Sequence, residues 1–238
     1  MQMNYNTPTT AIIVAGGTGT RMGGEKPKQF FLLNGKQILG HTIESFLQSY
    51  NHIEVILVLP EAHLEEGMKI ASELGEGRKI IPVTGGVTRW ESVRNGLAKV
   101  QHNGIVLIHD GVRCLVQPDL IRRCCEQALF KGSAVPVVPA TDSIRVVNGE
   151  SSRVADRDSI RLVQTPQTFQ VEPLREAFSQ CIRNDYTDEA TVWEAAGRHV
   201  ELIQGNHENI KITRPVDLLI AAAILERRSG LEPSNRKR

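Results

Sequence analysis

Short apolar runs alternate with stretches of helical periodicity along most of the chain. Four runs are continuous and rich in β-branched residues, and they predict buried strands at 11–14, 55–59, 79–83 and 105–108. Apolar residues recur at helical spacing over 38–49, 61–74, 88–99 (with Thr88 as a possible cap) and from Pro118 onward. Continuous apolar strands with helical crossovers predict an α/β fold whose mostly parallel sheet has helices on both faces. Ligands of such sheets bind at the carboxyl ends of strands, so we expect a site in the loops after Val14, Val83 and Ile108.

The pattern changes after Val138. Residues 142–158 are polar, with strand-like pieces at 143–147 and 152–155 around a turn at Asn148-Gly149, and they predict a β-hairpin arm over about 140–158. Because a polar two-stranded hairpin is marginally stable alone, we expect the arm to pack on a second subunit of a homodimer. A solvated flap is the alternative.

Helical patterns return at 173–181 and 188–196, followed by strands near Val200 and Asn209 and a last helix over 215–227. The polar residues 229–238 predict a frayed tail, which leaves one domain over 1–228.

Composition narrows the class of protein. Lys and Arg total 28 against 27 Asp and Glu, so the basic excess typical of nucleic-acid binding is missing. No apolar stretch approaches the ~18 residues of a membrane span, and the first ten residues are polar, so we expect a cytoplasmic protein. The four cysteines contain no CxxC pair and predict packed, reduced thiols.

A glycine-rich loop after the first predicted strand carries the strongest chemical signal. It contains Ala15, Gly16, Gly17, Thr18 and Gly19. Such a loop brings backbone N–H groups against a polyanion. Arg21 and Lys28 can reach the same phosphates. The loop lacks the GKS or GKT of a P-loop, and its spacing does not fit a dinucleotide fingerprint.

Further motifs follow in order: Gly85-Gly86-Val87-Thr88-Arg89-Trp90-Glu91-Ser92-Val93, His109-Asp110-Gly111-Val112-Arg113, Gln164-Thr165-Pro166-Gln167, Thr187-Asp188-Glu189-Ala190 and Asn209-Ile210-Lys211-Ile212-Thr213-Arg214-Pro215. Over nearly its whole length the chain resembles nucleotidyltransferases, and more narrowly the 2-C-methyl-D-erythritol 4-phosphate cytidylyltransferases of the non-mevalonate isoprenoid pathway. The resemblance implies a Rossmann-like nucleotidyltransferase fold. It also implies transfer of CMP from CTP to a polyol phosphate by direct in-line attack, with release of pyrophosphate and dependence on Mg²⁺ or another divalent cation.

The resemblance also implies roles for single residues. Arg21, Lys28 and Lys211 would be catalytic and stabilise charge on the phosphates. CTP would be bound by Ala15, Gly16, Gly17, Thr18, Gly19, Gly85, Gly86, Ser92 and Asp110, with close backbone favouring a pyrimidine. Taken alone, Ser92 could be a helix-surface serine and Lys211 a solvated charge on a strand that closes the sheet.

The acceptor would be bound by Asp110, Arg113, Ser143, Arg157, Thr165 and Thr187, with Arg157 reaching the site of a neighbouring subunit. Asp110 is also the candidate to place Mg²⁺, directly or through water, because this ion prefers few carboxylates plus phosphates and water. Its alternative is an N-cap of the helix at Pro118 or a turn residue. Asp188 and Glu189 could equally be acids of a first helical turn.

Some positions depart from the family pattern. Relatives often have an acid at the position of Val87, and Ala-Ala-Arg-Pro where this chain has Gly111-Val112-Arg113-Cys114. The second departure leaves D-ribitol 5-phosphate open as the acceptor, and a sugar-1-phosphate nucleotidyltransferase is a more distant alternative. A non-catalytic nucleotide sensor is disfavoured, because such a binder does not need the set Arg21, Lys28, Asp110 and Lys211.

Overall fold

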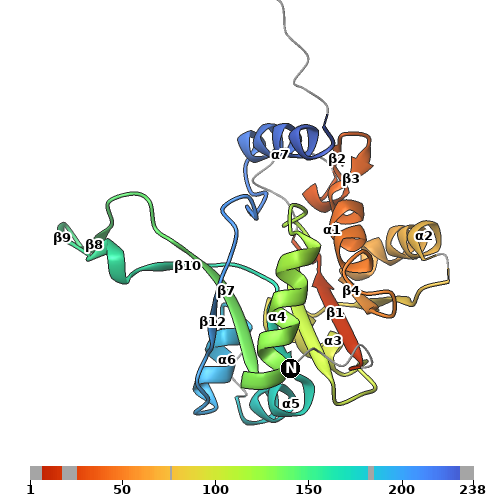
Figure 1. Ribbon diagram of the computed structural model, residues 1–238, viewed down its shortest axis with the longest axis horizontal. Coiled ribbons are helices and arrows are strands. Elements are labelled where there is room, and N and C mark those ends of the chain that lie inside the picture. Colours follow the sequence, from red (N-terminus) through yellow and green to blue (C-terminus); the bar gives the residue numbers. More distant parts are fainter. Residues whose placement is uncertain (1–6, 18–25, 76, 182–184, 231–238) are drawn as a thin grey trace, which may run out of the picture.

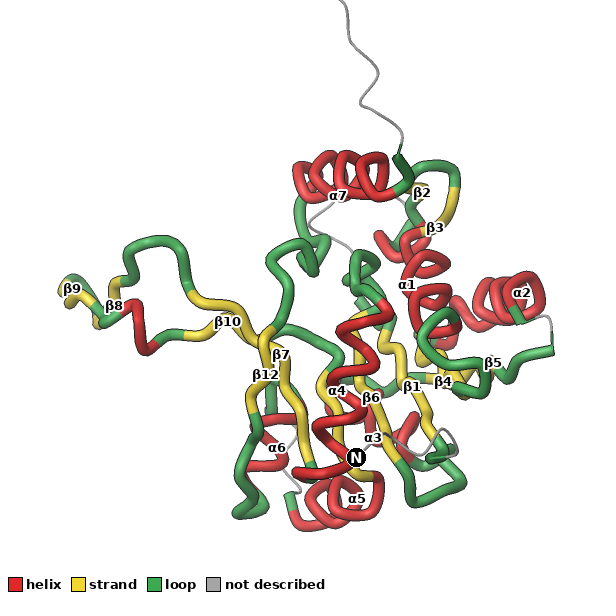
Figure 2. The backbone as a smooth tube through the Cα atoms, in the orientation of Figure 1, coloured by secondary structure: helices red, strands yellow, loops and turns green. Residues whose placement is uncertain are grey.

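A mixed sheet forms the centre of the computed structural model, which describes residues 7–17, 26–75, 77–181 and 185–230. The sheet has eight strands in the order β10-β7-β11-β6-β1-β4-β5, and β12 pairs with β7 (Figures 1 and 2). Its strands are β1 (Thr9–Val14), β4 (Glu54–Leu59), β5 (Ile80–Thr84), β6 (Ile105–Asp110), β7 (Ser133–Pro139), β10 (Arg161–Val163), β11 (Gln167–Gln170) and β12 (Leu202–Gln204). The four predicted strands are β1, β4, β5 and β6, and they pair in parallel. Strand β11 runs antiparallel to both β6 and β7.

Helices cover both faces of the sheet, which confirms the predicted fold class. One apolar core joins the sheet to α1 (Ile38–Leu47), α2 (Leu64–Leu74) and α4 (Pro118–Lys131). The core on the other face includes α3 (Arg89–Leu97), α5 (Val171–Gln180) and α6 (Glu189–Ala195). Strand β4 shows why its run is continuously apolar: Val55 and Leu57 belong to the first core, and Ile56 and Val58 to the second.

The last helix, α7 (Pro215–Arg228), packs against a third and smaller apolar cluster. The short strands β2 (Leu32–Leu33) and β3 (Lys36–Gln37) form a separate ribbon. Single turns of 3₁₀ helix occur at η2 (Lys28–Phe30), η3 (Glu61–His63) and η4 (Arg157–Ser159). The helix expected over 61–74 is therefore divided into η3 and α2.

The predicted hairpin arm is present and extends away from the sheet (Figure 1). It consists of β8 (Arg145–Asn148) and β9 (Ser151–Val154), every residue of which is exposed. Asn148 pairs with Ser151, so the turn lies at Gly149-Glu150, one residue later than predicted. Gly149 has a φ of 58°, which a glycine adopts at little cost.

The strand expected near Asn209 is not formed: residues 209–213 belong to no strand and pair with none of the described strands. All four cysteines are buried, free thiols, as predicted. Among the described residues, no helix has both the length and the apolar character needed to cross a membrane.

Candidate active site

A cavity of about 280 Å³ lies at the carboxyl ends of β1 and β6. Val14 and Asp110, the last residues of these strands, are paired in register and both line it. The other described lining residues are Ala15, Gly16, Gly17, Lys28, Gln29, Gly86, Val87, Thr88, Arg89, Ser92, Val112 and Lys211. The cavity therefore collects residues from the loops that the topology of the sheet singles out.

The turn before α3 forms one wall. Thr88 caps α3 as predicted, with its hydroxyl accepting from the Glu91 N–H at 3.1 Å, while the Glu91 carboxylate accepts from the Thr88 N–H. The Gly86 N–H donates to Ser92 Oγ at 3.1 Å, and a Cβ on Gly86 would lie 2.2 Å from that of Glu91. Glycine is therefore required here. Ser92 is buried, so its interpretation as a surface serine is wrong.

Lys28 also lines the cavity. The neighbouring Gln29 is buried, and its Nε2 donates to the Ala15 carbonyl at 2.8 Å. This bond ties η2 to the chain that leaves β1, which places Lys28 beside Gly16 and Gly17. Thr18, Gly19 and Arg21 lie outside the described residues.

Asp110 is the one carboxylate among the described lining residues, and three cations surround it. Its Oδ2 lies 2.9 Å from Lys211 Nζ and 3.4 Å from Arg113 Nε, and its Oδ1 lies 3.5 Å from Arg89 Nε. Burial alone would raise the pKa of Asp110, but Arg89, Lys211 and Arg113 together hold it well below its usual range. Asp110 is therefore ionised at physiological pH. It does not cap α4, whose N-cap is Gln117.

Lys211 lines the cavity from the segment 209–213, just before α7. The Ile212 N–H donates to the Val112 carbonyl at 3.0 Å, and Asn209 Nδ2 donates to the Thr165 carbonyl at 2.8 Å. Arg113 Nη1 donates to the Asn209 carbonyl at 2.9 Å. Side chains and one backbone bond, instead of a strand, thus present Lys211 to Asp110.

Thr165 and Arg113 both contact Asp110. The Thr165 hydroxyl accepts from the Asp110 N–H at 3.1 Å and lies 2.9 Å from His109 Nδ1. Burial lowers the pKa of His109 to about 3, so this imidazole is neutral at physiological pH. Neither Thr165 nor Arg113 lines the cavity.

The remaining predicted acceptor residues lie away from the cavity lining. Ser143 and Arg157 are exposed in the arm, where Arg157 Nη1 donates to the Thr141 carbonyl at 3.0 Å. Thr187 is exposed just before α6. Asp188 caps α6 and accepts from the Thr191 N–H at 2.9 Å. Glu189 follows in the first turn of the helix, which agrees with the alternative interpretation of these two residues as acids at a helix start.

Sequence reasoning missed Arg89 as a site residue. It assigned Arg89 only to the start of a helix, but both terminal guanidinium nitrogens of this residue donate to the buried carboxylate of Glu189. The available signal was the position of Arg89 in one motif, after Gly85 and Gly86 and before Ser92.

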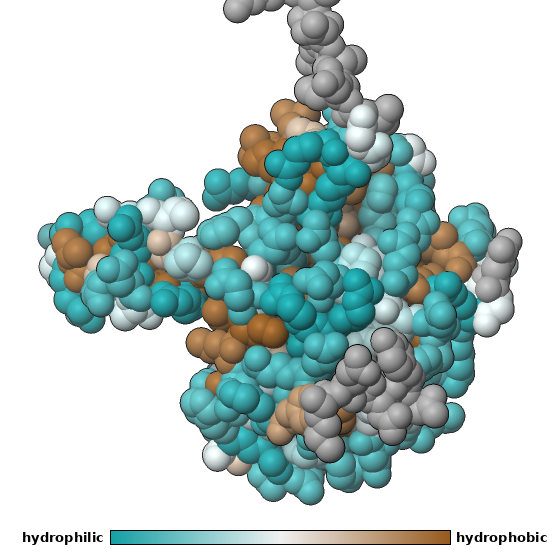
Figure 3. Space-filling view, viewed as in Figure 1, coloured by the Kyte–Doolittle hydropathy of each residue, from teal (hydrophilic) through white to brown (hydrophobic). Residues whose placement is uncertain are grey.

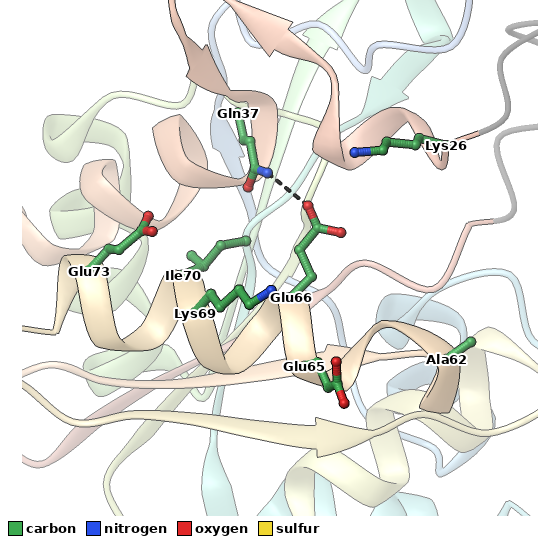
Figure 4. A pocket seen from close by; sticks show the side chains of 8 residues that line it. All are labelled: Lys26, Gln37, Ala62, Glu65, Glu66, Lys69, Ile70 and Glu73. Atoms are coloured by element: carbon green, nitrogen blue, oxygen red, sulfur yellow. Dashed lines mark hydrogen bonds between the residues drawn. The ribbon is translucent and has the colours of Figure 1, made fainter.

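A second cavity, of about 340 Å³, lies along α2 (Figure 4). Gln37 Nε2 donates to Glu66 at 2.9 Å across it. Three glutamates of α2 line it with Lys26 and Lys69, and their charge does not favour phosphates. The cavity at Asp110 is therefore the candidate active site.

Comparison with known proteins matches residues 9–227 to the family model described as 2-C-methyl-D-erythritol 4-phosphate cytidylyltransferase. The protein of that name from Bacteroides fragilis is 43% identical over 216 residues, covering 91% of this chain and 99% of that one. The one from Alkaliphilus oremlandii is 39% identical over 235 residues, covering 96% and 100%. The crystal structure of the enzyme from Thermus thermophilus aligns with a TM-score of 0.74 at 33% identity, covering 92% of this chain and 98% of that one. The chain belongs to the 2-C-methyl-D-erythritol 4-phosphate cytidylyltransferase family.

Proposed function

We propose that the protein transfers CMP from CTP to 2-C-methyl-D-erythritol 4-phosphate, giving 4-diphosphocytidyl-2-C-methyl-D-erythritol and pyrophosphate. The observation that carries this proposal is the arrangement of Lys28, Lys211 and the glycine turns in one cavity at the strand ends. Family membership supplies the identity of the substrates.

The chemistry requires that two anions approach each other. CTP brings about four negative charges and the acceptor phosphate about two, so catalysis depends on positioning and on neutralising charge. Lys28 and Arg21 would bind the triphosphate and stabilise charge on the α-phosphorus. Lys211 would contact the α-phosphate or the arriving acceptor phosphate during in-line attack. Because the acceptor phosphate is the nucleophile, no covalent enzyme intermediate is needed.

A divalent cation, Mg²⁺ or another, fits this site as a companion of the triphosphate. Among the described residues, no cluster of three or more His, Cys, Asp or Glu could form a protein cage for a metal. Mg²⁺ usually uses one or two carboxylates together with phosphates and water, and Asp110 supplies one carboxylate. The ion would add positive charge on the phosphates, and with three cations around Asp110 a contact through water suits the site.

We also propose that the arm forms a homodimer. Val146, Val147 and Val154 are exposed on the arm, and Leu162 and Leu202 are exposed where it joins the sheet. Figure 3 shows apolar surface on the arm and near its base. A partner that covers these side chains would bring its own Arg157 to this subunit, as the resemblance to the family implies.

Pyrophosphate release with CTP and Mg²⁺ tests the function, comparing 2-C-methyl-D-erythritol 4-phosphate with D-ribitol 5-phosphate. We expect a strong preference for the methylerythritol acceptor. A preference for ribitol phosphate would contradict the proposed acceptor and direct attention to Val112, which lines the cavity where relatives often have alanine. CTP binding without turnover of either acceptor would contradict the catalytic function.

A further inference from the structure

Arg89 lines the cavity and joins α3 to α6. It is the first residue of α3, directly after the turn that contains Gly85 and Gly86. Glu189 is the first residue of α6, directly after Thr187 and Asp188. A hundred residues separate the two in sequence, yet Arg89 Nη1 and Nη2 both donate to the Glu189 carboxylate, Nη2 at 3.0 Å.

The same guanidinium reaches the centre of the site. Its Nε lies 3.5 Å from Asp110 Oδ1, whereas Lys211 contacts the other carboxylate oxygen. All three nitrogens of Arg89 therefore have carboxylate partners. This arrangement suits a residue that orients others more than one that binds phosphate itself.

Hydrogen bonds to β11 also hold the start of α6. Gln167 on β11 donates from Nε2 to Asp188 at 2.9 Å and accepts from the Ala190 N–H at 2.8 Å. Glu189 itself is 1% exposed. A buried ion pair adds little to the free energy of unfolding, because apolar residues of similar volume stabilise a protein as well or better. Its position beside the cavity points instead to a role in the site.

We propose that Arg89 and Glu189 are positioning residues that fix the acceptor end of the site, orienting Asp110 and the segment containing Thr187 relative to the nucleotide turn. This role rests on the proposed function. Removing Arg89 leaves Glu189 buried without its partner and frees one side of Asp110. The acceptor phosphate would then meet a misplaced Lys211, whereas the turn that faces the nucleotide would keep its own capping hydrogen bonds.

The test uses the full-length variants Arg89→Met, Glu189→Gln and the double variant. For both single variants we expect the KM for the acceptor to rise about ten- to a hundred-fold, with a much smaller change in the KM for CTP. The double variant should be no worse than the worse single variant, since both act through one interaction. Arg89→Lys should recover part of the acceptor KM. Arg94→Met and Glu194→Gln, on the same helices, are matched controls and should leave the kinetics unchanged.

Other outcomes would overturn the proposal. If Arg89→Met raised mainly the KM for CTP while Glu189→Gln had no effect, Arg89 would bind the nucleotide directly. If all variants lowered stability without a selective change in the acceptor KM, the pair would be structural only. A wild-type protein that turns over no acceptor would refute the proposed function instead. Chemical denaturation of the wild type, the two single variants and the double variant would then still measure the Arg89–Glu189 coupling, and its absence would refute the pairing by itself.

Discussion

The carboxylate of Asp110 shows how neighbours give a single residue its role. Within a buried strand end it would be costly as an isolated charge, but Lys211 at 2.9 Å and two arginines compensate it. Asp110 in turn holds the ammonium group of Lys211 at a defined position in the cavity. Lys28 differs, because it is brought to the cavity by the backbone and by the Gln29–Ala15 hydrogen bond.

Lys28→Ala should reduce kcat/KM for CTP by about 10²- to 10³-fold, because a positioned cation that meets developing charge is lost. Lys28 is half-buried and outside the three apolar cores, so the midpoint of thermal unfolding should change little. Steady-state kinetics and a thermal melt measure both quantities. Lys69→Ala, at the acidic cavity, is the control lysine. Loss of folding in Lys28→Ala would show a structural role.

Asp217 gives a pH-dependent stability that can be measured. Partial burial raises its pKa, but hydrogen bonds from the N–H groups of Thr213, at 2.7 Å, and Arg214, at 2.8 Å, lower it on balance. A carboxyl with a depressed folded pKa stabilises the protein above its unfolded value of about 4 and loses that contribution as the pH falls.

The free energy of unfolding of Asp217→Asn should therefore fall about 1 kcal/mol below that of the wild type at pH 7. This difference in the free energy of unfolding between the variant and the wild type should shrink as the pH falls towards 3. Urea unfolding at the two pH values measures it. Asp119→Asn, an exposed carboxylate of α4, should show almost no gap at either pH. An equal gap for Asp217→Asn at both pH values would contradict this account.

At the scale of elements, the site depends on how helices begin. α3 starts with a capping box at Thr88 and Glu91, and α6 starts at the Asp188 cap. These caps place Arg89 and Glu189 in the first turn of their helices, where the two side chains can meet. The segment before α7 depends likewise on Asp217 in the first turn of that helix, which accepts hydrogen bonds from the backbone of Thr213 and Arg214.

Thr88→Ala should lower the free energy of unfolding by about 1 kcal/mol, since the Glu91 N–H loses its acceptor. Thr88→Ser keeps the hydroxyl and should restore most of that loss. Chemical denaturation compares the three proteins. If serine restored nothing, the methyl group of Thr88, and not its hydrogen bond, would carry the effect.

At the scale of the whole molecule, the arm is the part that one chain leaves uncovered. Its two strands contact each other and are exposed along their whole length. A two-stranded ribbon of this kind gains stability by packing against another surface. The exposed valines therefore favour a partner over a solvated flap.

Val147→Asp should shift the protein from dimer to monomer in light scattering at assay concentrations, because a charge would have to be buried in the interface. Val147 is 69% exposed in the single chain, so the fold itself should tolerate the change. Leu219→Asp on α7, a residue that is 73% exposed, is the matched control and should leave the mass unchanged. A wild-type monomer would refute the dimer, and a Val147→Asp dimer would refute its interface at the arm.

The sequence alone determined the parallel centre of the fold, because continuous apolar runs with helical crossovers suit a sheet buried on both faces. It also indicated Lys28, Lys211 and the glycine turns as parts of one site, because these residues occur in short local motifs, and the structure brings them to one cavity. Strands without that pattern could not be predicted in the same way. β10 and β11 lie among polar residues. The segment at Asn209 forms no strand and is held by side-chain hydrogen bonds of Asn209 and Arg113 and by one backbone bond from Ile212. Only the tertiary structure decided that Arg89 meets Glu189 and Asp110, since contacts between residues so far apart in sequence arise from the packing of whole elements.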